Sequence, residues 1–84
     1  MGKHDKVMDK VIRGASDANI SFDDLRGLLT HLGFEKRIRG SRHLYRREGV
    51  EEKINLQREG NKAKPYQVRQ VRAIILEHHL AGEE

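Results

Sequence analysis

The sequence contains no cysteine and no tryptophan, one proline and four aromatic residues. Without cysteine it has no disulfide framework, no thiolate nucleophile and no cysteine-ligated metal. It also lacks an apolar run of about 18 residues, so no transmembrane helix is predicted, and its first residues lack the apolar stretch of a signal peptide. Together these absences predict one small cytoplasmic domain folded around a thin hydrophobic core.

Positive charge is confined to the middle of the chain. Residues 1–33 carry five Lys or Arg and five Asp, and residues 73–84 carry three Glu and no cation. Residues 34–72 carry twelve Lys or Arg against five Glu, a net charge of +7, and six of these cations lie in the acid-free segment 36–47. This distribution favours a nucleic-acid-binding face over the alternative, an ordinary solvated charged surface.

Apolar residues at helical spacing predict three helices, at 6–13, at 22–32 and from residue 65 to about residue 80. Gly14 is expected to end the first helix. Ser21 is the expected N-cap of the second helix, with Asp24 at its third position. The proline at residue 65 suits the first turn of the last helix, and Ala81-Gly82 is expected to close it.

Between the second and third helices, alternating residues predict an antiparallel meander of three strands, at 34–39, 42–47 and 52–57, followed by a polar loop at 58–64. The side chains expected on its buried face are Phe34, Ile38, Leu44, Ile54 and Leu56. A one-sided sheet covered by amphipathic helices gives a two-layer α+β sandwich. The helix–three strands–helix part, 21–81, matches the topology of double-stranded-RNA-binding domains, and residues 1–20 form an extra N-terminal helical extension.

The segment Gly40-Ser41-Arg42-His43-Leu44-Tyr45 places one imidazole inside a run of cations. An imidazole exchanges a proton near neutral pH, and the cations attract a polyanion. His43 is therefore a candidate general base for a ribose 2′-hydroxyl, which would then attack the adjacent phosphodiester without a metal. The candidate RNA ligands, which include a turn serine and the lysines before the last helix, are Arg39, Ser41, Arg42, Arg46, Lys62 and Lys64.

Strand alternation places His43 and Tyr45 on one face of the sheet and Leu44 on the other. If Leu44 faces the core, His43 is on the open face; in the opposite register Tyr45 is inside and His43 is partly buried. The sequence pattern does not decide between these registers. Tyr45 and Lys64 are candidate proton donors by residue type, and water would also serve. A histidine that only packs beside a turn is the competing interpretation of His43.

No metal site and no cofactor is predicted. The chain has no cysteine pair, no His-Glu-x-x-His motif and no carboxylate cluster in sequence. His78 and His79 are adjacent on a predicted helix, so their side chains point about 100° apart and do not easily share a metal.

The chain resembles the HicA family of mRNA interferase toxins over residues 21–80. The similarity rests on the helix ending in Leu32-Gly33-Phe34, the Gly-Ser-x-His pattern that ends at His43, a short third strand, and a basic loop before the helix that contains Val71 to Leu76. It implies a double-stranded-RNA-binding-like fold, mRNA cleavage by the histidine at position 43, and neutralisation by a HicB-like antitoxin that covers the active-site face. Many members have histidine or asparagine where this chain has Arg42. Many also have a histidine-containing segment after the third strand, whereas residues 53–64 of this chain contain no histidine.

Two other functions are compatible with the sequence. One is a non-catalytic RNA-binding module of the same fold, and the other is an interaction protein whose basic face docks an acidic partner. Double-stranded DNA is a weaker candidate ligand, because no predicted helix carries the cationic, base-reading pattern of a recognition helix.

Overall fold

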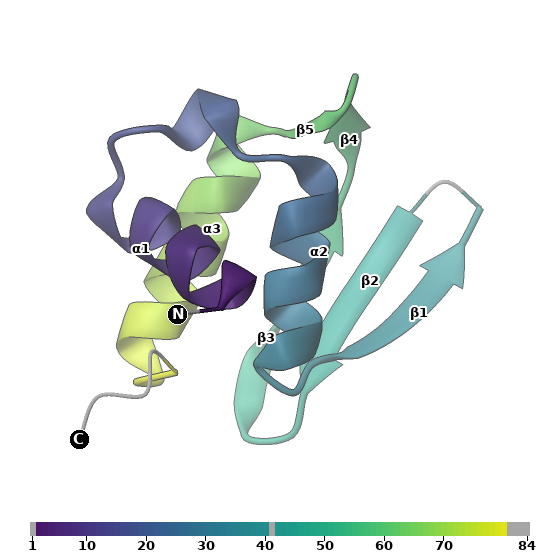
Figure 1. Ribbon diagram of the computed structural model, residues 1–84. Helices are drawn as coiled ribbons and strands as arrows, with labels where there is room; N and C mark the ends of the chain where they lie inside the picture. The colour runs from purple at the N-terminus through teal and green to yellow at the C-terminus, as the bar shows by residue number, and fades with distance from the viewer. Residues whose placement is uncertain (1, 41, 81–84) are drawn as a thin grey trace.

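The computed structural model describes residues 2–40 and 42–80, which form three helices, a three-stranded sheet and a small hairpin (Figure 1). The elements in chain order are α1 Lys3–Arg13, a 3₁₀ turn Asp17–Asn19, α2 Phe22–His31, β1 Glu35–Arg39, β2 Arg42–Arg47, β3 Val50–Leu56, β4 Arg58–Glu59, β5 Lys62–Ala63 and α3 Pro65–Glu77. The longer strands form one antiparallel sheet in the order β1-β2-β3. The predicted α+β fold with an antiparallel meander is confirmed.

Local sequence explains where α1 ends and where α2 begins. The Ser21 hydroxyl accepts a hydrogen bond from the Asp24 backbone N–H at 3.3 Å, so the predicted N-cap of α2 is confirmed. Gly14 ends α1 with a left-handed φ of 73°, which glycine adopts without steric cost. Helix α1 begins at Lys3 rather than at residue 6.

Helix α3 starts at its predicted proline but ends earlier than predicted. Its last residue is Glu77, because the backbone of His79 turns left-handed with a φ of 56°. The Leu80 N–H then donates back to the Ile75 carbonyl at 2.9 Å, which closes the helix as in a Schellman motif. The predicted Ala81-Gly82 ending lies outside the described residues.

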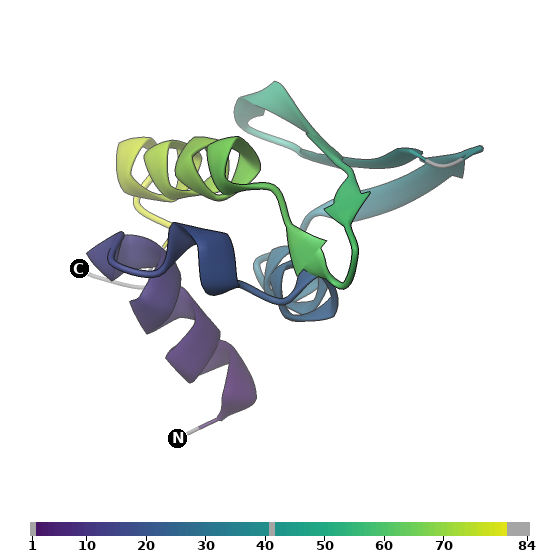
Figure 2. The ribbon, with the colours of Figure 1, turned by 90° about the horizontal axis from the view of Figure 1, so that it is seen from above.

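One hydrophobic core joins all three helices to the sheet. Helices α2 and α3 lie on one side of the sheet, and α1 packs beside them, away from the sheet (Figure 2). Val7 and Val11 of α1 are 5% and 0% exposed and belong to the same core as Leu25 and Ile54. The N-terminal helix is therefore packed as part of one core. None of the helices in the described part of the chain has the length and apolar character needed to cross a bilayer.

The sheet register buries Tyr45 and corrects two predictions. Three of the five side chains predicted to be buried are buried: Phe34, Ile54 and Leu56. Leu44 instead lies on the outer face, because Tyr45 is 1% exposed and strand neighbours point to opposite faces. With Leu44 inside, Arg42 and Arg46 would have faced the core too, and burying unpaired guanidiniums is costly. Ile38 is 53% exposed because it lies on the edge strand β1, whose residues are all exposed.

The segment after β3, predicted as a polar loop, forms the β4–β5 hairpin instead. Its backbone is tied to the chain around the start of α2: the Ala63 N–H donates to the Ile20 carbonyl at 2.9 Å, and the Phe22 N–H donates to the Asn61 carbonyl at 3.0 Å. These long-range hydrogen bonds, which no local pattern announces, stabilise strands of two residues each. They also bring Arg58 of β4 to the N-terminus of α2.

Arg72 links α3 to the segment before α2 through a largely buried ion pair. Its guanidinium donates to Asp17 at 3.0 and 3.4 Å and to the Val11 carbonyl at 3.2 Å. The Arg72 and Asp17 side chains are only 21% and 16% exposed. Removing one partner would leave the other charge partly buried and unpaired.

We expect Arg72→Met to lower the free energy of unfolding by about 2 kcal/mol, somewhat less than for a fully buried pair. Urea denaturation followed by circular dichroism measures this loss. Arg69→Met, at an exposed position of the same helix, is the matched control and should change stability by less than about 0.5 kcal/mol. Equal stabilities of the two variants would show that the ion pair contributes nothing.

Candidate functional site

His43 lies on the helix-facing side of β2, half-buried against the first residue of α2. Its ring meets the Phe22 ring edge-to-face, with centroids 5.2 Å apart and planes at 78°. Across the sheet His43 pairs with Ile38 and Leu56. Of the two registers that the sequence leaves open, the structure has the one with Tyr45 inside and His43 partly buried.

Two guanidinium groups share the Phe22 ring with His43. The Cζ atoms of Arg58 and Arg26 lie 4.7 and 5.7 Å from the ring centroid, within cation–π range. Asp23 Oδ1 forms ion pairs with both guanidiniums, lying 3.2 Å from Arg26 Nη2 and 3.5 Å from Arg58 Nη2. One aromatic ring at a helix start therefore gathers an imidazole and two cations from three separate elements.

The surroundings of His43 favour its neutral form. Burial lowers the pKa of His43 below its ordinary value of 6.5, and the positive charges of Arg26, Lys36 and Arg58 lower it further. Its Nδ1 atom is buried and has no hydrogen-bond partner among the described residues. A neutral imidazole is the form that accepts a proton at neutral pH. Because Nδ1 is buried, a proton from an external hydroxyl would have to reach the other ring nitrogen, Nε2.

We expect NMR titration of the His43 Cε1–H signal to give a pKa below 6.5. Lys36→Gln should raise that pKa, because one nearby positive charge is removed. Lys53→Gln, on the outer face of the sheet, is the charge-matched control and should move it less. A His43 pKa at or above 6.5 would contradict the described environment.

The lowered pKa of His43 also makes the stability of the fold depend on pH. Because the folded-state pKa of His43 is lowered, the unfolded chain takes up this proton more readily than the folded one. His43 therefore costs no stability above the unfolded pKa of about 6.5. The cost grows as the pH falls through the window between the unfolded and the folded pKa, and it is complete below the folded value.

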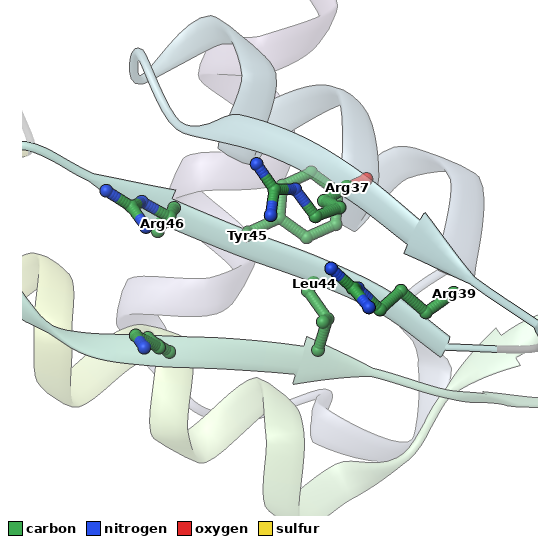
Figure 3. Close-up of a pocket in the computed structure, with 6 residues that line it drawn as sticks. Arg37, Arg39, Leu44, Tyr45 and Arg46 are labelled. Carbon is green, nitrogen blue, oxygen red and sulfur yellow. The ribbon is translucent and has the colours of Figure 1, made fainter.

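Three of the predicted RNA ligands lie on the other side of the sheet from His43. Arg42 and Arg46 each lie two positions from Leu44 on β2, and Arg39 pairs directly opposite Arg42 on β1, so all three share the face of Leu44. Figure 3 shows Arg39 and Arg46 beside Leu44, with the Tyr45 ring behind the strands. Arg39 and Arg46 border a pocket of about 200 Å³ whose lining also includes Arg37, Leu44, Tyr45 and Lys53. The sheet thus separates the predicted ligands on β1 and β2 from the predicted base.

The remaining predicted ligands lie near the two helix starts. Lys64 is the N-cap residue of α3, and its Nζ donates to Gln57 Oε1 at 3.3 Å, so the protein itself engages this ammonium group. Lys62 is exposed in β5 and forms a backbone bridge with Ser21 before α2. Ser41 lies outside the described residues.

The cations that do surround His43 are Arg26, Lys36 and Arg58, which the sequence reasoning does not single out. The position of Arg26 beside Phe22 could have been predicted from the sequence, since Arg26 lies four residues after Phe22 on the same helix face. Lys36 pairs directly with Tyr45 across the sheet, so its place on the face of His43 can be predicted once Tyr45 is known to face the core. The position of Arg58 depends on the β4–β5 hairpin and has no local sequence signal.

A separate cluster joins β3 to the end of α3. Glu52, Glu77 and His78 each place one potential metal-ligand atom within 4.8 Å of the others. His78 Nε2 lies 3.0 Å from Glu52 Oε1, and the Glu52 backbone together with His78 lowers the pKa of the Glu52 carboxyl below its usual 4.5. This contact accounts for the proximity of Glu52 and His78, and Glu77 directly precedes His78 in the chain.

No protein-family model, curated protein or solved structure matches this chain. The residues and the geometry around His43 are therefore the basis for assigning a function.

Proposed function

We propose that this protein is a HicA-type mRNA interferase: a cytoplasmic, metal-independent endoribonuclease with a double-stranded-RNA-binding-like fold. His43 is its general base. The observation that carries the proposal is a half-buried histidine whose pKa is lowered and which lies among Arg26, Lys36 and Arg58. A proton acceptor set among cations is the arrangement that cleavage of a polyanion by its own hydroxyl requires.

In the proposed reaction, neutral His43 removes the proton of a ribose 2′-hydroxyl. The 2′-oxygen attacks the adjacent phosphorus, the bond to the 5′-oxygen of the next nucleotide breaks, and a 2′,3′-cyclic phosphate forms. Water supplies the proton to the leaving oxygen. Arg26 and Arg58 lie beside His43 and exchange part of their contact with Asp23 for the phosphate oxygens, which stabilises the charge that builds up in the transition state.

The predicted RNA ligands that do not border His43 bind the RNA away from the bond that is cut. Arg39, Arg42 and Arg46 hold the RNA strand where it passes over the outer face, and Lys62 of β5 contacts it. Ser41 stays a predicted RNA ligand outside the described residues. Lys64 contributes positive potential rather than a free ammonium group, because Gln57 engages it. A HicB-like antitoxin would neutralise the protein by covering the face around His43.

The test is incubation of the protein with a long unstructured RNA in EDTA, followed by analysis of the product ends. We expect cleavage to persist in EDTA, the upstream fragment to carry a 2′,3′-cyclic phosphate, and substrates without a 2′-hydroxyl to stay intact. Cleavage that stops in EDTA and returns with a divalent metal, or cleavage of a 2′-deoxy substrate, would refute the mechanism.

A second function, a non-catalytic RNA-binding module, is favoured by the outer-face arginines. Arg39, Arg42 and Arg46 form a cationic surface that is independent of His43. For such a module, RNA binding would weaken steeply with salt while the RNA stayed uncut. The EDTA experiment separates the two functions, since only the enzyme produces cyclic ends.

A further inference from the structure

A groove of about 370 Å³ lies next to the His43 site, between α1, α2 and β1. Its lining includes Arg26 of α2 and Lys36 of β1, which are also two of the cations that act on His43. The groove is therefore continuous with the candidate site. Its volume falls within the range of about 300–1,000 Å³ that small-ligand sites occupy.

Two hydrogen-bonding groups in the lining of this groove have no partner among the described residues. Tyr45 is 1% exposed, and its hydroxyl is buried and unpaired. The Nε atom of Arg26 is likewise buried and unpaired. Buried polar groups are nearly always satisfied, so two orphans at one groove indicate a missing partner. Since an arginine N–H only donates and a tyrosine hydroxyl readily does, that partner has acceptor oxygens, and the neighbouring cations favour an anion.

The N-terminal helix forms one wall of the groove. The His4 ring of α1 stacks on the His31 ring of α2, with centroids 4.6 Å apart and planes at 9°. Gly27 of α2 leaves the room for this contact, since a Cβ there would lie only 3.2 Å from His4 Cε1. Flat aromatic side chains of this kind stack on unpaired nucleobases.

We propose that the groove is a nucleotide subsite for single-stranded RNA. Arg26, Lys36 and the Tyr45 hydroxyl bind a phosphate next to the bond on which His43 acts, and the His4–His31 pair receives the adjoining base. The identity of the ligand as RNA rests on the proposed function. The subsite gives α1 a role in substrate binding that is separate from its role in the core.

The test measures binding of a short, fluorescently labelled single-stranded RNA in which every 2′-hydroxyl is methylated, so that it cannot be cleaved. Tyr45→Phe should bind this RNA about tenfold more weakly, because one charge-assisted hydrogen bond is lost. The same variant should melt at a temperature no lower than the wild type, because the substitution removes an unpaired buried hydroxyl. Weaker binding together with unreduced stability is a result that a purely structural tyrosine would not give.

His4→Ala should weaken binding about fivefold or more through the lost stacking surface. The matched control is His79→Asn, which removes an exposed histidine elsewhere and suits the left-handed backbone at that position. Thermal melting establishes that each variant is folded at the temperature of the assay.

Wild-type affinity in both Tyr45→Phe and His4→Ala would overturn the subsite, as would a wild-type protein that does not bind the methylated RNA at low salt. The result is separable from the nuclease proposal because this RNA cannot be cut. Groove-dependent binding without cleavage of unmodified RNA would reject the enzyme and keep the subsite. Cleavage of unmodified RNA, with binding of the methylated RNA unchanged in both variants, would keep the enzyme and reject the subsite.

Discussion

Replacing His43 by alanine is expected to lower the rate of RNA cleavage by about 10²–10⁴-fold, the usual contribution of a general base. The fold should survive, because His43 is only half-buried and the hydrophobic core on either side of it does not depend on its ring. The measurement is the single-turnover cleavage rate in EDTA at neutral pH. In the wild type, the rate should fall on the acid side with an apparent pKa below 6.5, because the environment lowers the pKa of His43.

Two controls make the His43 experiment decisive. Circular dichroism and thermal melting show whether His43→Ala remains folded, and His79→Asn, which changes an exposed histidine, should cleave at the wild-type rate. A folded His43→Ala protein that cleaves RNA as fast as the wild type would remove His43 from the mechanism.

Replacing Phe22 by alanine is expected to lower the free energy of unfolding by about 3–5 kcal/mol, the usual cost of deleting a buried aromatic ring. Phe22 is 1% exposed, so the substitution opens a cavity where α2 meets the sheet. A domain of this length has a total stability of only about 4–13 kcal/mol. The melting temperature should therefore drop by roughly 12 °C or more. Urea denaturation and thermal melting both measure the effect.

Tyr66→Ala is the matched control for Phe22→Ala, since it removes an aromatic ring that is 53% exposed and should change stability by less than about 0.5 kcal/mol. Under conditions where Phe22→Ala is still folded, it should also cleave slowly, because the ring contacts His43, Arg26 and Arg58. A stability loss below about 1 kcal/mol would mean that the core closes over the missing ring.

The features that the sequence predicts correctly are local ones. Ser21 with Asp24 marks a helix start through a hydrogen bond within one turn, and Gly14 marks a helix end through its own φ. Helical and strand periodicity then locate the elements, because each period reflects one buried face. Residue type and local charge also make His43 a candidate base, and that role stays a prediction.

What the sequence does not predict depends on contacts between distant segments. The register of β2 is one such feature, although the arginines on either side of Leu44 argue against burying that face. The hairpin that places Arg58 is another, since it forms through backbone hydrogen bonds to residues some forty positions earlier. Gln67 is a third: it is 2% exposed, and its side-chain amide donates to the Asn55 carbonyl and accepts from the Gln57 N–H, which holds β3 against α3.

Strand β1 lies at the edge of the sheet, and all five of its side chains are exposed. An exposed edge strand is a template for pairing with another chain, and a second copy of this protein would offer the same edge. In this molecule the edge carries Lys36, Arg37 and Arg39, so two copies approaching edge to edge repel one another. These three cations therefore disfavour self-assembly into an extended sheet, and an incoming strand rich in acidic side chains is the kind that this edge would attract.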